Sequence, residues 1–413
     1  MSTLSGWRQN KRSQCCRGNI GLVGRWKRCR VRGSARVNLK WIDSQDSLDE
    51  VIDSILRCSR YAIDTEFHRE RTYFPRLALV QIRWENQTAL IDPLAVDPRG
   101  LDRLFNSELV AVFHAAQQDL EVLRHAALCA PKNIFDCQVA AGFVGFSNPS
   151  LATLVQAFKR VSMSKGDRLT DWLQRPLTEQ QCKYAADDVA HLFDLHDELN
   201  RQLSQLGRVE WVADSCLELA TRATIAQKSS DAWLKMKETR GLKGSSRGVA
   251  QALAQWREEK AMRSDLPPRR VMSDMALVGI SQRIPKSVEE LASIRGIDDR
   301  HLATENCREI MAAIRDGSKN EVSLPVVEFD DVDKVARPAL TLITAWVGEL
   351  ARRHKLDATL LATRNDITMF LRNMPDARLR QGWRATLVGD DLNRIVNGEV
   401  GLSVDRNGHL KLV

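Results

Sequence analysis

Two carboxylates one residue apart are the first feature of the sequence that could do chemistry. Asp64 and Glu66 belong to the run of residues 61–67, whose composition predicts a buried strand. Side chains alternate along a strand, so both carboxylates point to the same face. Two adjacent buried acids repel each other unless a cation compensates their charge. The pair therefore indicates either a metal site or the solvated end of a strand.

Three more polar side chains are placed by helices. Asp119 falls in the first turn of a helix expected over residues 117–126, directly after a strand that runs out at His114. The helix dipole favours an acid there for structural reasons alone. Tyr184 and Asp188 are four residues apart on a later helix and so share one face. Taken alone, a Tyr/Asp pair of this kind is typical of a surface hydrogen bond.

The order and identity of these residues resemble the motifs of the DEDDy group of 3′→5′ exonucleases. The matching residues are Asp64, Glu66, Asp119, Tyr184 and Asp188. Further segments resemble bacterial ribonuclease D, namely residues 63–67, 71–77, 134–138 and 171–178. The resemblance covers about residues 39–205. A tyrosine at position 184, rather than a histidine, distinguishes the chain from the DEDDh branch, which includes oligoribonuclease.

The resemblance implies phosphodiester hydrolysis with two divalent metal ions as cofactors. Two ions about 4 Å apart can serve the attacking water and the leaving 3′ oxygen. Hard carboxylate ligands favour Mg²⁺ or Mn²⁺ over zinc, for which the sequence offers no Cys/His set. By resemblance, Asp64, Glu66 and Asp188 hold the ion on the nucleophile side. Asp64 also bridges to a second ion, which Asp119 supports.

The same resemblance implies roles for the remaining site residues. Tyr184 orients the attacking water, and because a phenol with an ordinary pKa of ~10 is a poor base at neutral pH, activation of the water falls to the metal. Thr65, Phe67 and His114 are predicted to contact the substrate. His114 is otherwise interpreted as a structural residue at a strand edge.

Positioning these residues requires a mixed sheet flanked by helices. Residues 77–84 and 88–91 predict two strands joined by a turn, and residues 109–113 predict a further strand. A capping box at residues 178–181 opens a helix that is expected to run to about Gln202. This alternation predicts an α/β domain, which the resemblance makes RNase H-like.

Beyond Val209 the sequence predicts helices, with no convincing strand until the last residues. A polar loop at residues 241–248 is followed by an amphipathic helix over residues 249–263. A second capping box, at Ser287, opens a helix that is expected to stop at Gly296.

Two all-α HRDC-type domains are therefore expected after the catalytic domain. Residues 253–297 resemble the helicase-and-RNase-D C-terminal (HRDC) domain, a helical nucleic-acid-binding module. Residues 339–398 resemble the second helical domain of ribonuclease D, or else form a generic helical bundle. The predicted organisation is a basic, unstructured extension (1–38), the exonuclease domain (39–205), the HRDC domain (206–318), a linker (319–338) and a second HRDC-like domain (339–413).

The net charge of +8 does not mark the folded body as a nucleic-acid binder. Residues 1–40 carry 11 Lys or Arg and no Asp or Glu, so the other residues carry 50 basic and 53 acidic side chains. The basic N-terminus is an unstructured extension, a misassigned start or a mitochondrial presequence. Nine cysteines without metal-ligand spacing indicate a reducing, cytoplasmic location. No apolar run approaches the roughly 20 residues of a membrane span.

The sequence thus predicts a 3′→5′ exoribonuclease that trims precursor tRNA and other small structured RNAs and releases nucleoside 5′-monophosphates. RNA is the expected partner, and we expect a monomer with no obligate protein partner and no membrane association. Two alternatives stay open. One is a DNA-directed 3′→5′ exonuclease, although no polymerase or helicase segment is present. The other is a non-catalytic RNA-binding scaffold, against which the complete set of carboxylates argues.

Overall fold

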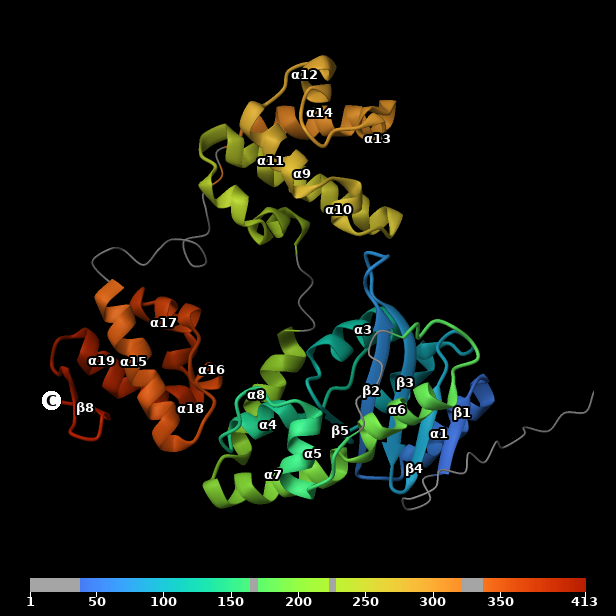
Figure 1. Cartoon of the computed structure of the whole chain (residues 1–413), viewed down its shortest axis with the longest axis vertical. Helices are drawn as coiled ribbons and strands as arrows, with labels where there is room; N and C mark the ends of the chain where they lie inside the picture. Colours follow the sequence, from blue (N-terminus) through green and yellow to red (C-terminus); the bar gives the residue numbers. More distant parts are fainter. Residues whose placement is uncertain (1–37, 164–169, 223–227, 321, 323–336) are drawn as a thin grey trace, which may run out of the picture.

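The computed structural model describes residues 38–163, 170–222, 228–320, 322 and 337–413. The predicted extension (1–38) lies outside the described residues except for Asn38, and the predicted linker (319–338) lies mostly outside them. Figure 1 shows an α/β part that carries a six-stranded sheet, followed by two parts built mainly of helices. No helix among the described residues is long and apolar enough to cross a membrane.

The six-stranded sheet of the α/β part is mixed. Its strands follow the order β1-β4-β3-β2-β5-β6. Pairs β2–β3 and β3–β4 are antiparallel, whereas β1–β4, β2–β5 and β5–β6 are parallel. The strands are β1 (Asn38–Ile42), β2 (Arg60–His68), β3 (Arg76–Trp84), β4 (Gln87–Ile91), β5 (Val110–Phe113) and β6 (Ile134–Asp136). The expected mixed sheet flanked by helices is confirmed, and the four predicted strands agree with the observed bounds to within a residue.

Helices cover both faces of this sheet. They are α1 (Gln45–Ile55), η1 (Pro98–Leu101), α2 (Asp102–Phe105), α3 (Gln117–Ala127), α4 (Cys137–Gly142), α5 (Leu151–Lys159), α6 (Glu179–Ala190), α7 (Leu192–Leu206) and α8 (Val209–Arg222). On one face, Trp84 Nε1 of β3 donates a hydrogen bond to Ser54 Oγ of α1 at 3.1 Å. On the other, α6 packs across β2, β3 and β4, with Ala185 in an apolar cluster that includes Leu79 and Leu90.

The capping box at Thr178 is confirmed, but the single helix expected to run from it to about Gln202 is wrong. Helix α6 ends one residue before His191 and α7 begins one residue after it. His191 has φ −107° and ψ −5°, and the Ala190 carbonyl accepts a hydrogen bond from the Arg83 guanidinium of β3. The apolar period continues in phase through this break, so the sequence pattern does not reveal it.

The second part, residues 228–320, is helical. Its elements are η2 (Ser229–Lys235), η3 (Lys237–Gly241), α9 (Gly244–Ser264), α10 (Pro268–Val271), α11 (Asp274–Arg283), α12 (Val288–Ala292), α13 (Asp299–Leu302) and α14 (Thr304–Ser318). The polar loop predicted at residues 241–248 is wrong over most of its length, because α9 already begins at Gly244. A Cβ at Gly248 would lie 2.2 Å from Gly317 O of α14, so this glycine permits a close helix contact rather than a loop.

Helix α12 begins at its predicted cap and ends early. Ser287 Oγ accepts the Glu290 N–H at 3.3 Å. The Glu290 carboxylate accepts the N–H of Lys286 at 2.7 Å, so the reciprocal half of the capping box is displaced by one residue. The helix ends at Ala292 rather than at the expected stop, Gly296.

The third part, residues 337–413, is helical up to a terminal hairpin. Its elements are α15 (Arg337–His354), α16 (Ala358–Leu361), α17 (Arg364–Leu371), η4 (Arg378–Arg380), α18 (Gly382–Arg384), η5 (Ala385–Gly389), α19 (Asp390–Val396), β7 (Leu402–Val404) and β8 (Leu410–Leu412). The hairpin corrects the expectation of an all-α domain to the end of the chain. Its turn contains Asn407-Gly408, with φ +81° at the glycine. The HRDC-like identity of this part stays a prediction.

One apolar core extends across the α/β part and the third part. It contains buried residues from Ile42 to Leu392. Trp383 of α18 stacks on Trp211 of α8, with ring centroids 4.9 Å apart and 13° between the planes. Phe143 packs against the Trp383 indole in a T-shaped arrangement, with ring centroids 5.2 Å apart. These two parts therefore fold around shared apolar contacts.

The second part contacts the α/β part through the loop between β2 and β3. The Tyr73 hydroxyl donates to Glu258 Oε1 of α9 at 2.7 Å. The backbone N–H groups of Tyr73 and Phe74 both donate to Asp265 Oδ1 at 3.1 Å. Phe74 also stacks on His125 of α3, with centroids 4.2 Å apart. We call this set the Tyr73 contact, and it ties the loop that follows β2 to the second part.

Candidate active site

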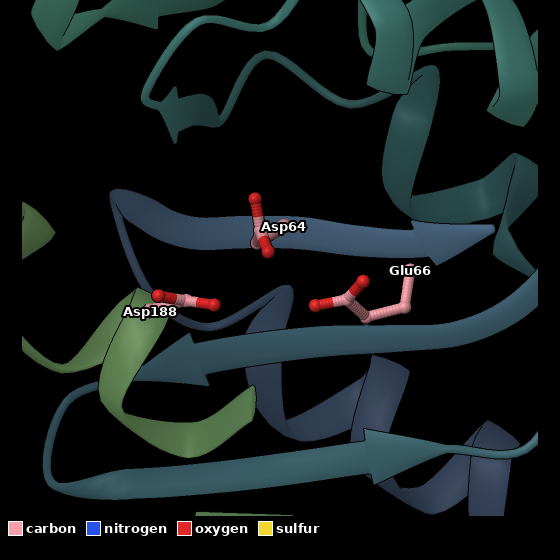
Figure 2. Close-up of side chains that lie close together, drawn as sticks. All are labelled: Asp64, Glu66 and Asp188. Carbon is pink, nitrogen blue, oxygen red and sulfur yellow. The ribbon is translucent and has the colours of Figure 1, made fainter. Parts of the chain in front are cut away.

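Strand β2 and helix α6 bring three carboxylates together (Figure 2). Asp64 and Glu66 project from β2, and Asp188 reaches them from α6. One carboxylate oxygen from each residue lies within 4.8 Å of the other two. Figure 2 shows the carboxylates of Glu66 and Asp188 pointing toward each other, with Asp64 beside them. The i, i+2 spacing on the strand thus puts both acids on the face that α6 covers.

Asp119 lies next to this group without joining it. The pairing of β2 with β5 covers Arg60 to Ala62, so β2 continues past the end of β5, where the chain turns into α3. Thr65 Oγ1 donates a hydrogen bond to Asp119 Oδ1, and Asp119 is only 7% exposed. Its charge acts on Asp64, but its oxygens lie outside the 4.8 Å group. Asp119 is therefore held at the edge of the group by the residue between the two strand acids.

Asp136 fixes the turn that precedes Asp119, a role that its place in the sequence does not reveal. It ends β6 and is 1% exposed. Its carboxylate accepts the backbone N–H groups of Ala115 at 3.1 Å, Ala116 at 2.8 Å and Gln138 at 2.8 Å. Ala115 has φ +61°, a left-handed conformation that a non-glycine residue keeps only where its surroundings hold it. Asp136 is thus a positioning residue for the start of α3.

Tyr184 lies one turn before Asp188 on α6, as the spacing predicts. Its ring is tilted by 40° against the indole of Trp172, with centroids 6.0 Å apart. Trp172 is 4% exposed, and its backbone N–H donates to His68 Nε2 at 3.3 Å. Because His68 is the last residue of β2, the strand that carries two of the acids also anchors the residue that packs on Tyr184.

Arg175 secures the same segment in front of α6. Its guanidinium donates two hydrogen bonds of 2.7 Å to the two carboxylate oxygens of Asp92. It also donates to the carbonyls of Ala78 at 2.6 Å and Trp172 at 2.7 Å. Asp92 is 5% exposed, so removal of Arg175 would leave a buried carboxylate uncompensated. The sequence motif contains this arginine without indicating that it is a clamp.

Burial raises the pKa values of Asp64, Glu66 and Asp119, and neighbouring charges add to the effect. Burial, and then the charges of Asp119, Asp188 and Glu66, hold the pKa of Asp64 well above its usual range. Burial and the charges of Asp188 and Asp119 raise the pKa of Glu66 to about 8. Burial also raises the pKa of Asp119 to about 7, although the hydrogen bond from Thr65 opposes the change. Ionising all of these acids near neutral pH requires a compensating cation.

This donor set suits a hard divalent cation. All three residues of the close group offer carboxylate oxygens, the ligands that Mg²⁺ and Mn²⁺ prefer. A bound cation displaces the protons that these carboxylates would otherwise keep near neutral pH. Its positive charge lowers the carboxylate pKa values, whereas the neighbouring acids raise them. The three residues can therefore hold a metal ion, and Asp119 lies beside them through its hydrogen bond with Thr65.

The three predicted substrate contacts have different surroundings. Thr65 is 6% exposed, and its hydroxyl donates a hydrogen bond to the Asp119 carboxylate, so it acts as a positioning residue. Phe67 is half-buried, with the Arg69 guanidinium 5.6 Å from its ring centroid. His114 Nδ1 is buried and lacks a hydrogen-bond partner in the part of the chain that the structure describes, and burial lowers the pKa of this histidine. Contact with substrate stays a prediction for all three.

Comparison with known families matches two consecutive regions of the chain. Residues 39–204 match the 3'-5' exonuclease family. Residues 246–314 match the HRDC domain family. The first region contains all five predicted catalytic residues, and the second contains helices α10 to α13 and most of α9 and α14.

Curated relatives and a solved structure are similar over most of the chain. Ribonuclease D of Acidiphilium cryptum is 33% identical over 378 residues, which covers 88% of this chain and 94% of the relative. Ribonuclease D of Gluconacetobacter diazotrophicus is 33% identical over 371 residues with the same coverage. The crystal structure of Escherichia coli RNase D, described as an exoribonuclease involved in structured RNA processing, superposes with a TM-score of 0.79 at 28% identity. That match covers 88% of this chain and 99% of the other.

Proposed function

The chain belongs to the ribonuclease D family and is a 3′→5′ exoribonuclease, and from this premise we propose that it uses divalent metal ions to trim the 3′ ends of precursor tRNA and other small structured RNAs. The observation that carries the metal dependence is the group formed by Asp64, Glu66 and Asp188, whose carboxylate oxygens lie within 4.8 Å of one another. The similarity to an exoribonuclease of structured RNA supports the choice of substrate.

In the proposed reaction, Asp64, Glu66 and Asp188 would hold one Mg²⁺ or Mn²⁺ ion, and Asp119 would help Asp64 to hold a second. When bound, such a pair supplies a water of lowered pKa and neutralises the charge that develops on the leaving 3′ oxygen. Tyr184, one turn from Asp188, orients that water by hydrogen bonding. Attack on the terminal phosphodiester releases a nucleoside 5′-monophosphate and leaves a new 3′-OH on the RNA.

The other residues around the site act by position. Thr65 holds the Asp119 carboxylate, and Asp136 holds the turn from which α3 begins. Trp172 packs against Tyr184, so the phenol keeps its place relative to α6. Catalysis in this scheme depends on preorganised geometry, because Asp119 and Tyr184 are held in place by the buried residues Thr65 and Trp172.

We propose that the helical parts hold the body of the RNA. The division is an exonuclease domain (39–205), an HRDC domain (206–318) and a second HRDC-like domain (339–413). The family match at residues 246–314 supports the second of these, and the helices α15 to α19 support the third. The Tyr73 contact supports a fixed relation between the HRDC domain and the end of β2. All six cysteines among the described residues are free thiols, in keeping with a cytoplasmic location.

The test uses the full chain and a tRNA that carries a 3′ extension. In Mn²⁺ we expect stepwise loss of the extension and release of nucleoside 5′-monophosphates, and in EDTA we expect RNA binding without shortening. An extension made of deoxynucleotides serves as the matched control. Faster loss of the deoxy extension would indicate a DNA-directed exonuclease, and binding without shortening in either condition would indicate a scaffold.

A further inference from the structure

Gln81 of β3 carries a buried amide that has no hydrogen-bond partner in the described part of the chain. Its side chain is 0% exposed. Neither Oε1 nor Nε2 has a hydrogen-bond partner among the described residues. A buried primary amide can donate two hydrogen bonds and accept two, and leaving all of them unmade costs free energy of folding. A leucine of similar volume would fill the same place without that cost.

The position of Gln81 links it to the carboxylates. In the antiparallel pairing of β2 with β3, Gln81 is the direct partner of Asp64. Directly opposed residues of an antiparallel pair place their side chains on the same face, with Cβ atoms roughly 4.5–5.5 Å apart. On its other side, Gln81 is the partner of Leu90 in β4, which belongs to the apolar cluster beneath α6. The amide is therefore confined between the acids and an apolar layer.

Thr88 of β4 shows what an unpartnered polar group looks like away from the acids. Its hydroxyl is also buried without a partner among the described residues, and its side chain is 1% exposed. It pairs with Arg83 rather than with an acidic residue. Gln81 and Thr88 thus share burial and an unmet hydrogen-bonding group, but only Gln81 faces a carboxylate across the strand pair.

We propose that Gln81 is a positioning residue for metal binding, whose amide N–H donates to the Asp64 carboxylate when a divalent cation occupies the site. The inference rests on the proposed metal-dependent function. A carboxylate that gives an oxygen to a cation keeps other lone pairs available, and outer hydrogen-bond donors fix its orientation. The amide of Gln81 is the buried donor that the strand register places opposite Asp64. This hydrogen bond would give a partner to an amide that has none among the described residues.

The experiment compares the full-length wild type with Gln81→Leu, Gln81→Met and the control Thr88→Val. Mn²⁺ binding to each metal-free protein is measured by calorimetry, and thermal unfolding is followed in EDTA and in excess Mn²⁺. Exonuclease assays on a short RNA determine the Mn²⁺ dependence of kcat and the KM for RNA. For Gln81→Leu and Gln81→Met we expect Mn²⁺ affinity to fall by roughly 10–100-fold, the range typical of lost outer partners of a ligand.

The remaining readouts separate a metal-positioning role from a purely structural one. In EDTA both Gln81 variants should unfold at the wild-type temperature or above it, because they remove an unpartnered amide. Excess Mn²⁺ should restore most of kcat, and the KM for RNA should not change. Thr88→Val should keep the wild-type Mn²⁺ affinity.

Three results would overturn the inference. Wild-type Mn²⁺ affinity in both Gln81 variants would do so while leaving the proposed function intact. Gln81 variants that lose stability in EDTA along with their Mn²⁺ affinity would show that the amide supports the fold. A wild-type protein that binds no Mn²⁺ would instead overturn the proposed function, and this inference with it.

Discussion

At the scale of single residues, the carboxylates of the site repel one another, and a bound cation would relieve that repulsion. The carboxylates of Asp64, Glu66 and Asp188 lie close together. Apolar contacts between α6 and the sheet, rather than contacts among the acids, keep them there. The raised pKa values of Asp64 and Glu66 show that burial and neighbouring charges disfavour their ionised forms. Substitutions that relieve this crowding should therefore have opposite effects on stability and on catalysis.

The substitution Asp188→Asn should show both effects. In Mn²⁺ it should lower the single-turnover rate on a short RNA by more than the roughly 10–100-fold that loss of an outer hydrogen-bond partner costs, because a metal ligand is removed. In EDTA it should raise the unfolding midpoint, by about 2–4 °C for each kcal/mol of repulsion relieved. Asp194→Asn on α7, which pairs with Lys159, serves as the control. A wild-type rate for Asp188→Asn would remove this residue from the site.

The pH dependence of stability should carry the signature of Glu66. Its pKa in the folded protein is about 8, against an ordinary value of 4.5, so the folded state retains a proton that the unfolded chain loses. The folded state is therefore destabilised progressively as the pH rises from about 4.5 to about 8. In EDTA, Glu66→Gln should become increasingly more stable than the wild type over this window, as measured by urea unfolding. A difference that is constant with pH would contradict the raised pKa.

Tyr184→Phe should separate orientation of the water from metal binding. Loss of one hydrogen bond from the phenol is expected to lower kcat by roughly tenfold, while the packing of the ring on Trp172 is retained. Calorimetry should show unchanged Mn²⁺ affinity. If the loss equals that of Asp188→Asn, Tyr184 does more than position the water.

The spacing of residues in the sequence was sufficient to predict the charged residues of the site. It was insufficient to predict the residues that hold them in position. The i, i+2 and i, i+4 spacings of Asp64/Glu66 and Tyr184/Asp188 follow from strand and helix periods, and the structure brings the three acids of these pairs together. The partners Thr65–Asp119 and Asp64–Gln81 depend on chain crossings and strand register, which no local pattern encodes. Asp136 was visible within a motif, but its hydrogen bonds to the turn at Ala115 were not.

At the scale of elements, α6 carries two site residues and begins at a well-formed cap. Thr178 Oγ1 accepts the Gln181 N–H at 3.2 Å, and Gln181 Oε1 accepts the Thr178 N–H at 2.9 Å. The first turn of this helix lies directly ahead of Tyr184. Loss of the cap should therefore disturb the site as well as the helix.

Thr178→Ala is expected to cost about 1 kcal/mol of stability, as is usual for an N-cap residue. Faster hydrogen exchange in the first turn of α6 and a moderate drop in kcat should accompany it. Ser287→Ala removes the corresponding cap of α12 in the second part and should cost similar stability without lowering kcat on a short RNA. Equal effects on kcat would show that the activity loss reflects general destabilisation.

The elements themselves were predictable wherever one period dominated. Strands β2 to β5 are short, apolar and bounded by turns, and their predicted and observed bounds nearly coincide. The break at His191 was hidden because the apolar stripe continues in phase across it. Gly248 suggested a loop, although its lack of a side chain instead allows α9 and α14 to touch.

At the scale of the whole molecule, the Tyr73 contact joins the second part to the strand that supplies Asp64. Tyr73→Phe removes the hydrogen bond to a charged partner, Glu258, which typically contributes about 1.5–3 kcal/mol. Trimming of a tRNA with a 3′ extension should slow by roughly tenfold, because RNA held by the second part is no longer aligned with the site. Hydrolysis of a short single-stranded RNA should be unaffected.

The control for this prediction is Lys235→Met. Lys235 also contacts Glu258, at 3.5 Å, but it belongs to the second part itself. Trimming rates should match the wild type on both substrates. If Tyr73→Phe slows the short RNA as much as the long one, the contact acts on the catalytic site directly rather than on alignment.

The shared core of the α/β part and the third part has a consequence for biosynthesis. A ribosome completes Phe143 and Trp211 long before Trp383, the indole that covers them. Throughout that interval the nascent catalytic unit displays an aromatic surface to its surroundings, of the kind that invites aggregation or chaperone capture. Translation of a transcript truncated ahead of α18 would yield a polypeptide that has all the catalytic acids but exposes the aromatic surface of Phe143 and Trp211, and we expect it to aggregate.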